Sequence, residues 1–145
     1  MPKRPDSRAK TANPTPGDYR ALAGFRYALR KFLTFSEDAA RGVGLTPQQH
    51  QALLVIMGYP ESETVTIGAL AQRLLLKHHS TVELVDRLTE LELVRRIRDT
   101  DDRRRVILRL TKKAEQVLGR LSAVHLEELR RIRPALAALL ERLDD

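Results

Sequence analysis

The segment from Arg95 to Thr111, RRIRDTDDRRRVILRLT, constrains the fold of this chain more than any other. Two short runs of strand-forming residues flank an Asp-rich, turn-forming centre. In the second run Val106, Leu108 and Leu110 occupy alternate positions, which is the period of a half-buried strand. The segment follows directly on a helical pattern that begins with Ser and Thr. We therefore predict a β-hairpin that projects beside a helix.

The helix before this hairpin is predicted to be the second half of a helix-turn-helix. Thr66 is a candidate N-cap for a short helix over 67–75, and a brief turn leads to the next helix, near 79–91. Another helix is indicated upstream by Thr46 followed by Pro47 at the first helical position. Two helices joined by a tight turn and followed by a hairpin are typical of a winged helix-turn-helix.

Long helical segments stand at both ends of this unit. Asp18 is the expected N-cap of a helix that runs to about Arg41, and Thr111 is the expected N-cap of a later helix. Pro134 either interrupts this later helix or starts a new one. Their apolar surface exceeds what a minimal winged helix needs and has to be covered. We therefore predict a homodimer. Residues 1–17 contain four prolines and are predicted to be a disordered leader. This leader is either simply solvated or a basic arm that contacts DNA.

Composition narrows the class of partner. The 145 residues suffice for one domain, contain no cysteine, and carry a net charge of +7, which favours a polyanion. Between 95 and 105 six arginines accompany three aspartates, and five of the six aromatic side chains lie earlier, between 19 and 35. Because no aromatic interleaves with the arginines, duplex DNA is favoured over single strands. No signal peptide or membrane span is recognisable, so we expect a cytoplasmic protein without membrane contact.

Enzyme and metal chemistry find no support in the sequence. There is no HExxH pattern, no Gly-rich phosphate loop and no thiol. His78 and His79 are adjacent on a predicted helix, so their side chains point about 100° apart and do not readily share one ion. We predict no catalytic residues, no metal and no cofactor.

Three segments resemble the MarR-type winged helix-turn-helix transcriptional regulators: LTPQQHQALLVI, TIGALAQRLLLKHHSTVELVDRL and DTDDRRRVILRLT. The resemblance implies a mainly α fold with a small β-hairpin wing. The DNA-binding region is then 45–111, and 18–41 and 112–145 are dimerisation helices of a single domain over 18–145. At two positions the chain departs from the family's pattern, since Glu92 and Ala114 stand where the family commonly has Gly.

The resemblance also assigns roles to residues of the wing. Asp102 and Arg104 match the family's D-x-R at the wing tip, so Arg104 is expected to enter the minor groove while Asp102 orients its guanidinium. A narrow, A·T-rich minor groove concentrates negative potential that attracts arginine. The alternative is a purely structural ion pair. Phosphate or strand-surface contacts, which add affinity without sequence information, are expected of Arg95, Arg96, Arg103 and Arg105.

The start of the reading helix is the second predicted contact surface. Its candidate DNA-binding residues are Lys77, His78, His79, Ser80, Thr81, Glu83 and Arg87. For Ser80 and Thr81 the alternative role is N-capping of the helix. Asp86 is expected to pair with a nearby arginine inside the protein.

The function that follows is a sequence-specific, duplex-DNA-binding repressor, a homodimer on a pseudo-palindromic operator, released by a small ligand. By resemblance, a phenolic or anionic effector binds near Tyr27, Phe32, Phe35, His50 and Met57, although ordinary core or dimer packing is the simpler role for each of these residues. The competing function is a winged-helix protein-interaction adaptor, which the acidic residues of the reading helix keep open.

Overall fold

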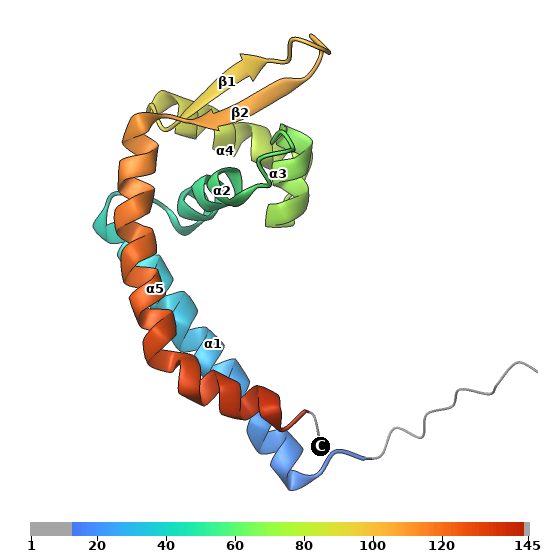
Figure 1. The fold of residues 1–145 in the computed structure, drawn as a ribbon, viewed down its shortest axis with the longest axis vertical. Helices are drawn as coiled ribbons and strands as arrows, with labels where there is room; N and C mark the ends of the chain where they lie inside the picture. The colour runs from blue at the N-terminus through green and yellow to red at the C-terminus, as the bar shows by residue number, and fades with distance from the viewer. Residues whose placement is uncertain (1–12, 144–145) are drawn as a thin grey trace, which may run out of the picture.

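Seven elements follow one another along residues 13–143, the part of the chain that this computed structural model describes (Figure 1). They are α1 (Pro16–Gly42), α2 (Pro47–Gly58), α3 (Ile67–Leu74), α4 (His78–Glu90), β1 (Val94–Arg98), β2 (Val106–Leu110) and α5 (Lys112–Glu141). The predicted fold class, mainly helical with a two-stranded wing, is confirmed. We call α2, α3, α4 and the wing (residues 94–110) the head, and α1 with the part of α5 that packs on it the arm.

Helix α1 begins earlier than the sequence predicted. Its N-cap is Thr15, whose hydroxyl accepts the Asp18 N–H at 3.2 Å while the Asp18 carboxylate accepts the Thr15 N–H at 2.8 Å. This is a capping box, so Asp18 is the third helical residue and not the cap. The hydrogen bonds to Thr15 lower the pKa of the Asp18 carboxyl. Pro16 and Gly17 thus belong to α1, while residues 1–12 of the predicted leader lie outside the described residues.

Threonine also caps three later helices, as predicted. The hydroxyls of Thr46, Thr66 and Thr111 each accept the N–H of the residue three positions on, at 3.1–3.2 Å. Such a cap contributes about 1 kcal/mol to helix stability. These short signals fix where α2, α3 and α5 begin, and therefore fix the lengths of the turns between elements.

The hairpin is antiparallel, and hydrogen bonds join it to the rest of the head and to the start of α5. Arg96 pairs with Leu108 and Val94 with Leu110 in the register. The Leu108 N–H donates to the Val65 carbonyl (2.8 Å), and the Thr111 hydroxyl donates to the Glu92 carbonyl (2.7 Å). The wing is therefore held both beside α3 and where it enters α5.

The hydrophobic core of the described residues is centred in the head and extends to Ala40 of α1 and to Ala114, Leu118 and Leu121 of α5. Its fully buried side chains come from α2, α3, α4 and both strands: Leu53, Leu70, Val85, Leu88, Val94 and Leu108. Full burial of a side chain of this size contributes about 1.5–3 kcal/mol. The core therefore fixes the wing and α4 against the same scaffold.

The arm is a pair of long helices that extends away from the head (Figure 1). Gly24 permits their close approach, because a Cβ at this position would lie 3.2 Å from the Leu139 side chain. Pro134 neither ends α5 nor starts a new helix, since α5 continues through it to Glu141. Figure 1 shows α5 bending in its C-terminal half, and a proline inside a helix, which removes one backbone hydrogen bond, gives a physical reason.

Glu92 adopts the left-handed backbone that glycine favours. Its φ is 58°, directly after α4, where the family pattern has Gly. Leu75, after α3, has the same conformation with φ 56°. A side chain in this region is strained against its own carbonyl, by about 1–2 kcal/mol. The departure at Glu92 therefore leaves the backbone geometry intact and costs stability.

We predict that Glu92→Gly raises the free energy of unfolding by about 0.5–1 kcal/mol, because relief of strain exceeds the added freedom of the unfolded chain. Urea unfolding measures the change. Glu90→Gly, two residues earlier and inside α4, is the matched control and should lower stability by about 1 kcal/mol. A loss of stability in Glu92→Gly would contradict the strain argument.

Candidate nucleic-acid interface

Helix α4 presents an exposed, polar stripe. His79, Glu83 and Arg87 recur every four residues, lie on one face of the helix and are all exposed. At the N-terminus Lys77 is the N-cap and makes no side-chain capping bond. The first N–H groups of α4 and its positive dipole end are therefore not met by a cap side chain, which suits a phosphate.

Thr81 corrects the predicted contact list. Its side chain is 0% exposed, and its hydroxyl donates to the Lys77 carbonyl at 2.9 Å. It can contact DNA only if the head unpacks. Ser80 is half-buried, whereas Lys77 and His78 are exposed. The alternative role is wrong too, because neither Ser80 nor Thr81 is the N-cap.

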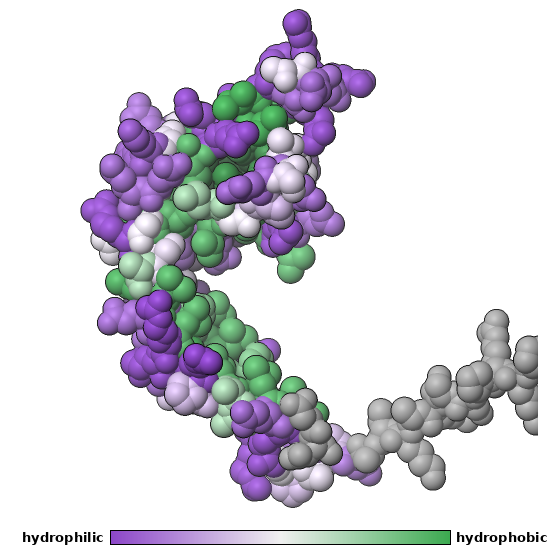
Figure 2. All heavy atoms as spheres, viewed as in Figure 1, coloured by the Kyte–Doolittle hydropathy of each residue, from purple (hydrophilic) through white to green (hydrophobic). Residues whose placement is uncertain are grey.

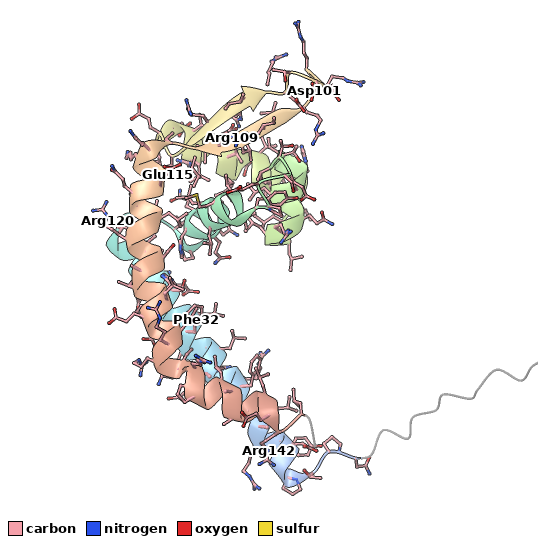
Figure 3. All side chains as sticks on the ribbon, in the orientation of Figure 1. Phe32, Asp101, Arg109, Glu115, Arg120 and Arg142 are labelled. Atoms are coloured by element: carbon pink, nitrogen blue, oxygen red, sulfur yellow. The ribbon has the colours of Figure 1, made fainter. Side chains whose placement is uncertain are left out.

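The wing tip, residues 99–105, holds Arg104 in one orientation while leaving it accessible. The Asp102 carboxylate accepts both the Arg104 backbone N–H (3.1 Å) and its Nε–H (3.3 Å). The Arg104 side chain is nevertheless 93% exposed. Figure 3 shows the tip, marked by Asp101, projecting away from the rest of the head. A guanidinium held in this way loses less conformational freedom on entering a groove.

The other four wing arginines predicted to contact DNA divide into two groups. Arg96 forms an ion pair with Asp86 of α4, so the intramolecular role predicted for Asp86 is confirmed. The Arg105 guanidinium donates to the Thr64 hydroxyl at 3.3 Å. Arg95 and Arg103 are exposed, and no described hydrogen bond engages their side chains. Arg96 and Arg105 thus support the wing in this state, while Arg95 and Arg103 are open to a phosphate.

This arrangement joins two candidate contact surfaces to one scaffold. The Arg96–Asp86 pair links β1 to α4, and Thr64, before α3, supports the start of β2. A helix of this size fits the major groove, and an arginine on a loop fits the minor groove. Sequence reasoning did not find Thr64, which lies 41 residues from Arg105 and carries no local signal.

The five predicted effector residues are spread over three places among the described residues. Phe32, Phe35 and His50 gather around His125, with ring centroids 6.0, 5.4 and 4.8 Å from its imidazole. Tyr27 shares only a shallow surface groove with Phe35. Met57 lies apart, in a cavity under the wing. An effector site formed by these five residues therefore stays a prediction.

His125 instead forms a junction between the arm and the head. Its Nδ1–H donates to the Leu121 carbonyl (2.6 Å), and its Nε2 meets the Ser36 hydroxyl (2.8 Å). Beside it His50 is only 3% exposed, and its Nδ1 has no hydrogen-bond partner among residues 13–143. Burial, and secondarily the neighbouring His125, lower the pKa of His50.

The described residues contain neither a cluster of metal ligands nor a helix that could span a membrane. Between residues 13 and 143, no three His, Cys, Asp or Glu side chains lie together as metal ligands. No helix in that range has the length and apolarity to cross a membrane.

Comparison with known sequences places these features in one family. The MarR family model matches residues 43–105, which span α2, α3, α4 and most of the wing. The uncharacterized HTH-type transcriptional regulator YsmB of Bacillus subtilis is 33% identical over an alignment of 113 residues that covers 75% of each chain.

Solved structures share the fold over most of the chain. The multiple antibiotic-resistance repressor MarR of Listeria monocytogenes is 25% identical, with a TM-score of 0.67 over 90% of this chain and 99% of that one. A mutant of MepR from Staphylococcus aureus, bound to an oligodeoxyribonucleotide, has a TM-score of 0.66 at 18% identity, over 86% and 97% of the two chains.

The buried imidazole of His50 predicts a pH-dependent stability. Its folded-state pKa lies below the ordinary value of about 6.5, so the unfolded chain takes up a proton that the folded chain resists. The stability from His50 is present above pH ~6.5 and is lost as the pH falls, by at most about 1.4 kcal/mol per pH unit. Denaturant unfolding at pH 7.5 and 5.5 should show that loss. His50→Gln should reduce this pH-dependent loss of stability, whereas His78→Gln, at an exposed position, should not. An equal loss of stability in the parent and in His50→Gln would contradict the role given to His50.

Proposed function

The chain belongs to the MarR family of transcriptional regulators, and from this premise we propose that it binds duplex DNA sequence-specifically as a homodimer. The observation that carries the proposal is the Asp102–Arg104 contact at the exposed wing tip. It leaves an oriented cation accessible beside a helix whose polar face is also accessible. The oligonucleotide bound to the MepR mutant supports the same use of this fold.

Each surface has a distinct role in the proposed complex. Arg104 enters the minor groove, where it responds to groove width more than to base identity. His79, Glu83 and Arg87 face the major groove, where Glu83 is suited to accept from a cytosine amino group. Lys77, Arg95 and Arg103 contact phosphates and add affinity without sequence information.

The apolar surface of the arm supports the homodimer. Along α1, Leu22, Phe25, Leu29 and Leu33 form one stripe and all are exposed; Leu22 is 57% exposed. The stripe continues across a cavity between the ends of α1 and α5 to Leu140. Figure 2 shows apolar side chains gathered along the arm. A patch of this extent is typical of an interface, and α1 with α5 therefore dimerises the chain.

We further propose that the dimer is a cytoplasmic, non-enzymatic repressor, released when a small ligand changes the spacing of the two heads. A ligand can do this only if it binds one spacing more tightly than the other. The junction around His125, which contacts α1, α2 and α5, is where such a preference would act. The adaptor function remains the competitor because of Glu83, an exposed acid on the reading stripe.

The DNA-binding proposal predicts that selection from random duplexes enriches a pseudo-palindrome. Arg104→Ala should then weaken binding to the selected duplex about tenfold, which is within the 1–3 kcal/mol of a specific contact. Fluorescence anisotropy at fixed salt measures the change. Arg104→Lys should recover only part of the loss, because an ammonium lacks the planar guanidinium.

Arg120→Ala, an equal loss of charge on the exposed side of α5, is the control and should leave the affinity nearly unchanged (Figure 3). If Arg104→Ala and Arg120→Ala weaken binding equally, Arg104 contributes only its positive charge and makes no specific contact with DNA. If no duplex is enriched, the adaptor function gains support and the DNA-binding proposal fails.

The dimer proposal predicts that Leu22→Asp separates the protomers, because it places a charge inside the proposed interface. Sedimentation velocity should show a monomer, and circular dichroism an intact helical fold, since Leu22 is exposed in the isolated chain. Leu75→Asp is the matched control, because Leu75 is 91% exposed but lies on the head. A dimeric Leu22→Asp protein would place the interface elsewhere.

A further inference from the structure

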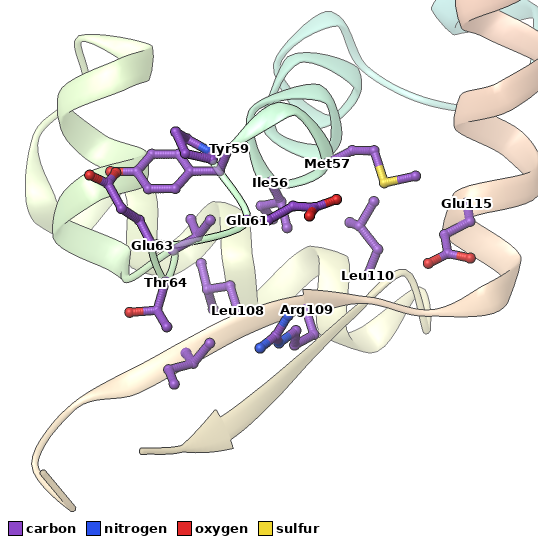
Figure 4. Close-up of a pocket in the computed structure, with 13 residues that line it drawn as sticks. Ile56, Met57, Tyr59, Glu61, Glu63, Thr64, Leu108, Arg109, Leu110 and Glu115 are labelled. Atoms are coloured by element: carbon purple, nitrogen blue, oxygen red, sulfur yellow. The ribbon is translucent and has the colours of Figure 1, made fainter. Parts of the chain in front are cut away.

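A cavity under the wing stands apart from both proposed surfaces. It has a volume of about 200 Å³ and lies between the end of α2, the loop 59–65, strand β2 and the start of α5 (Figure 4). Ile56, Val65 and Leu108 give it an apolar, buried floor, and the exposed side chain of Met57 lies at its rim. The cavity therefore offers an apolar side chain or ring a place out of water.

Charge at the rim of this cavity is mainly negative. Glu61 and Glu63 come from the loop, Glu115 comes from α5, and Arg109 of β2 is the single cation among the lining residues. None of these four forms an ion pair within the described range, 13–143. Figure 4 shows the Glu61 and Glu115 side chains reaching from opposite walls toward the space beside Met57 and Leu110. The net charge of the lining is negative although the chain as a whole is basic.

The walls of the cavity are held by contacts that do not depend on a ligand. The Leu108 N–H donates to the Val65 carbonyl at 2.8 Å, and Arg105 donates to the Thr64 hydroxyl at 3.3 Å. These bonds fix strand β2 against the loop. Small-molecule sites are usually pre-formed in this way, so binding does not have to order the walls.

We propose that this cavity binds a small organic cation, an ammonium group carried on a single ring. The ring lies on the apolar floor, and the ammonium lies between Glu61 and Glu115. DNA phosphates and anionic effectors are disfavoured here, because the carboxylates of Glu61 and Glu115 face them and Arg109 is the single cation of the lining (Figure 4). The volume is below the roughly 300–1,000 Å³ typical of drug-sized sites, which limits the ligand to about one ring.

The methionine methyl groups provide a direct test. The chain has two methionines, Met1 and Met57, so methyl-¹³C-methionine labelling gives a simple spectrum in which Met57→Leu assigns the cavity signal. Three ligands of nearly equal shape serve as probes: benzylammonium, benzyl alcohol and benzoate. We expect benzylammonium to shift the Met57 methyl signal saturably, benzyl alcohol to bind more weakly, and benzoate to leave the signal unchanged.

Removal of the two facing carboxylates tests the charge. The double variant Glu61→Gln, Glu115→Gln should raise the dissociation constant of benzylammonium roughly tenfold, since each exposed ion pair contributes up to about a fivefold change. Glu37→Gln, an exposed carboxylate on α1, is the matched control and should bind like the parent. Both replaced side chains are exposed, so the fold is expected to survive, and circular dichroism checks it.

Three outcomes would overturn the proposal: no saturable shift with benzylammonium, equal affinity for benzyl alcohol, or a double variant that binds like the parent. The measurement uses the full chain without DNA. It therefore stands or fails independently of the proposed transcriptional function.

Discussion

The anchoring of Leu108 is the interaction on which the rest of the head depends. Its side chain, 1% exposed, lies in the core, and its backbone N–H reaches the carbonyl of Val65. A two-stranded hairpin alone is marginally stable in water. Because this one residue ties β2 to the core and to the segment before α3, the exposed wing tip keeps a defined position beside α4. The cavity under the wing exists for the same reason.

Signals confined to a few neighbouring residues were readable from the sequence. Thr46 and Thr111 mark helix starts through bonds to the third residue beyond them, and the family resemblance pointed to Asp102 as the residue that holds Arg104 from two positions away. The same kind of signal misplaced the N-cap of α1. In a capping box both Thr15 and Asp18 are residues typical of an N-cap, so the sequence alone did not show which of the two is the cap.

Features that depend on packing were not readable. Thr81 lies on the start of α4 like its exposed neighbours, but a rotation of about 100° per residue turns it into the core, and only the positions of the other helices decide which residue faces inward. Thr64 and Arg105 meet across 41 residues of sequence. The same is true of His50 and His125, whose contact requires α2 and α5 to be placed first.

The Arg96–Asp86 pair has a mechanical consequence. It joins the strand that leads into the wing tip to the helix beside it, and so adds to the shared core that holds the two proposed DNA contacts at one separation. A rigid pair of contact points has one preferred separation. A duplex whose two grooves lie at another separation must bend or twist to meet both, at an energy set by its own base steps. Base pairs that no side chain touches would then contribute to operator choice through their stiffness.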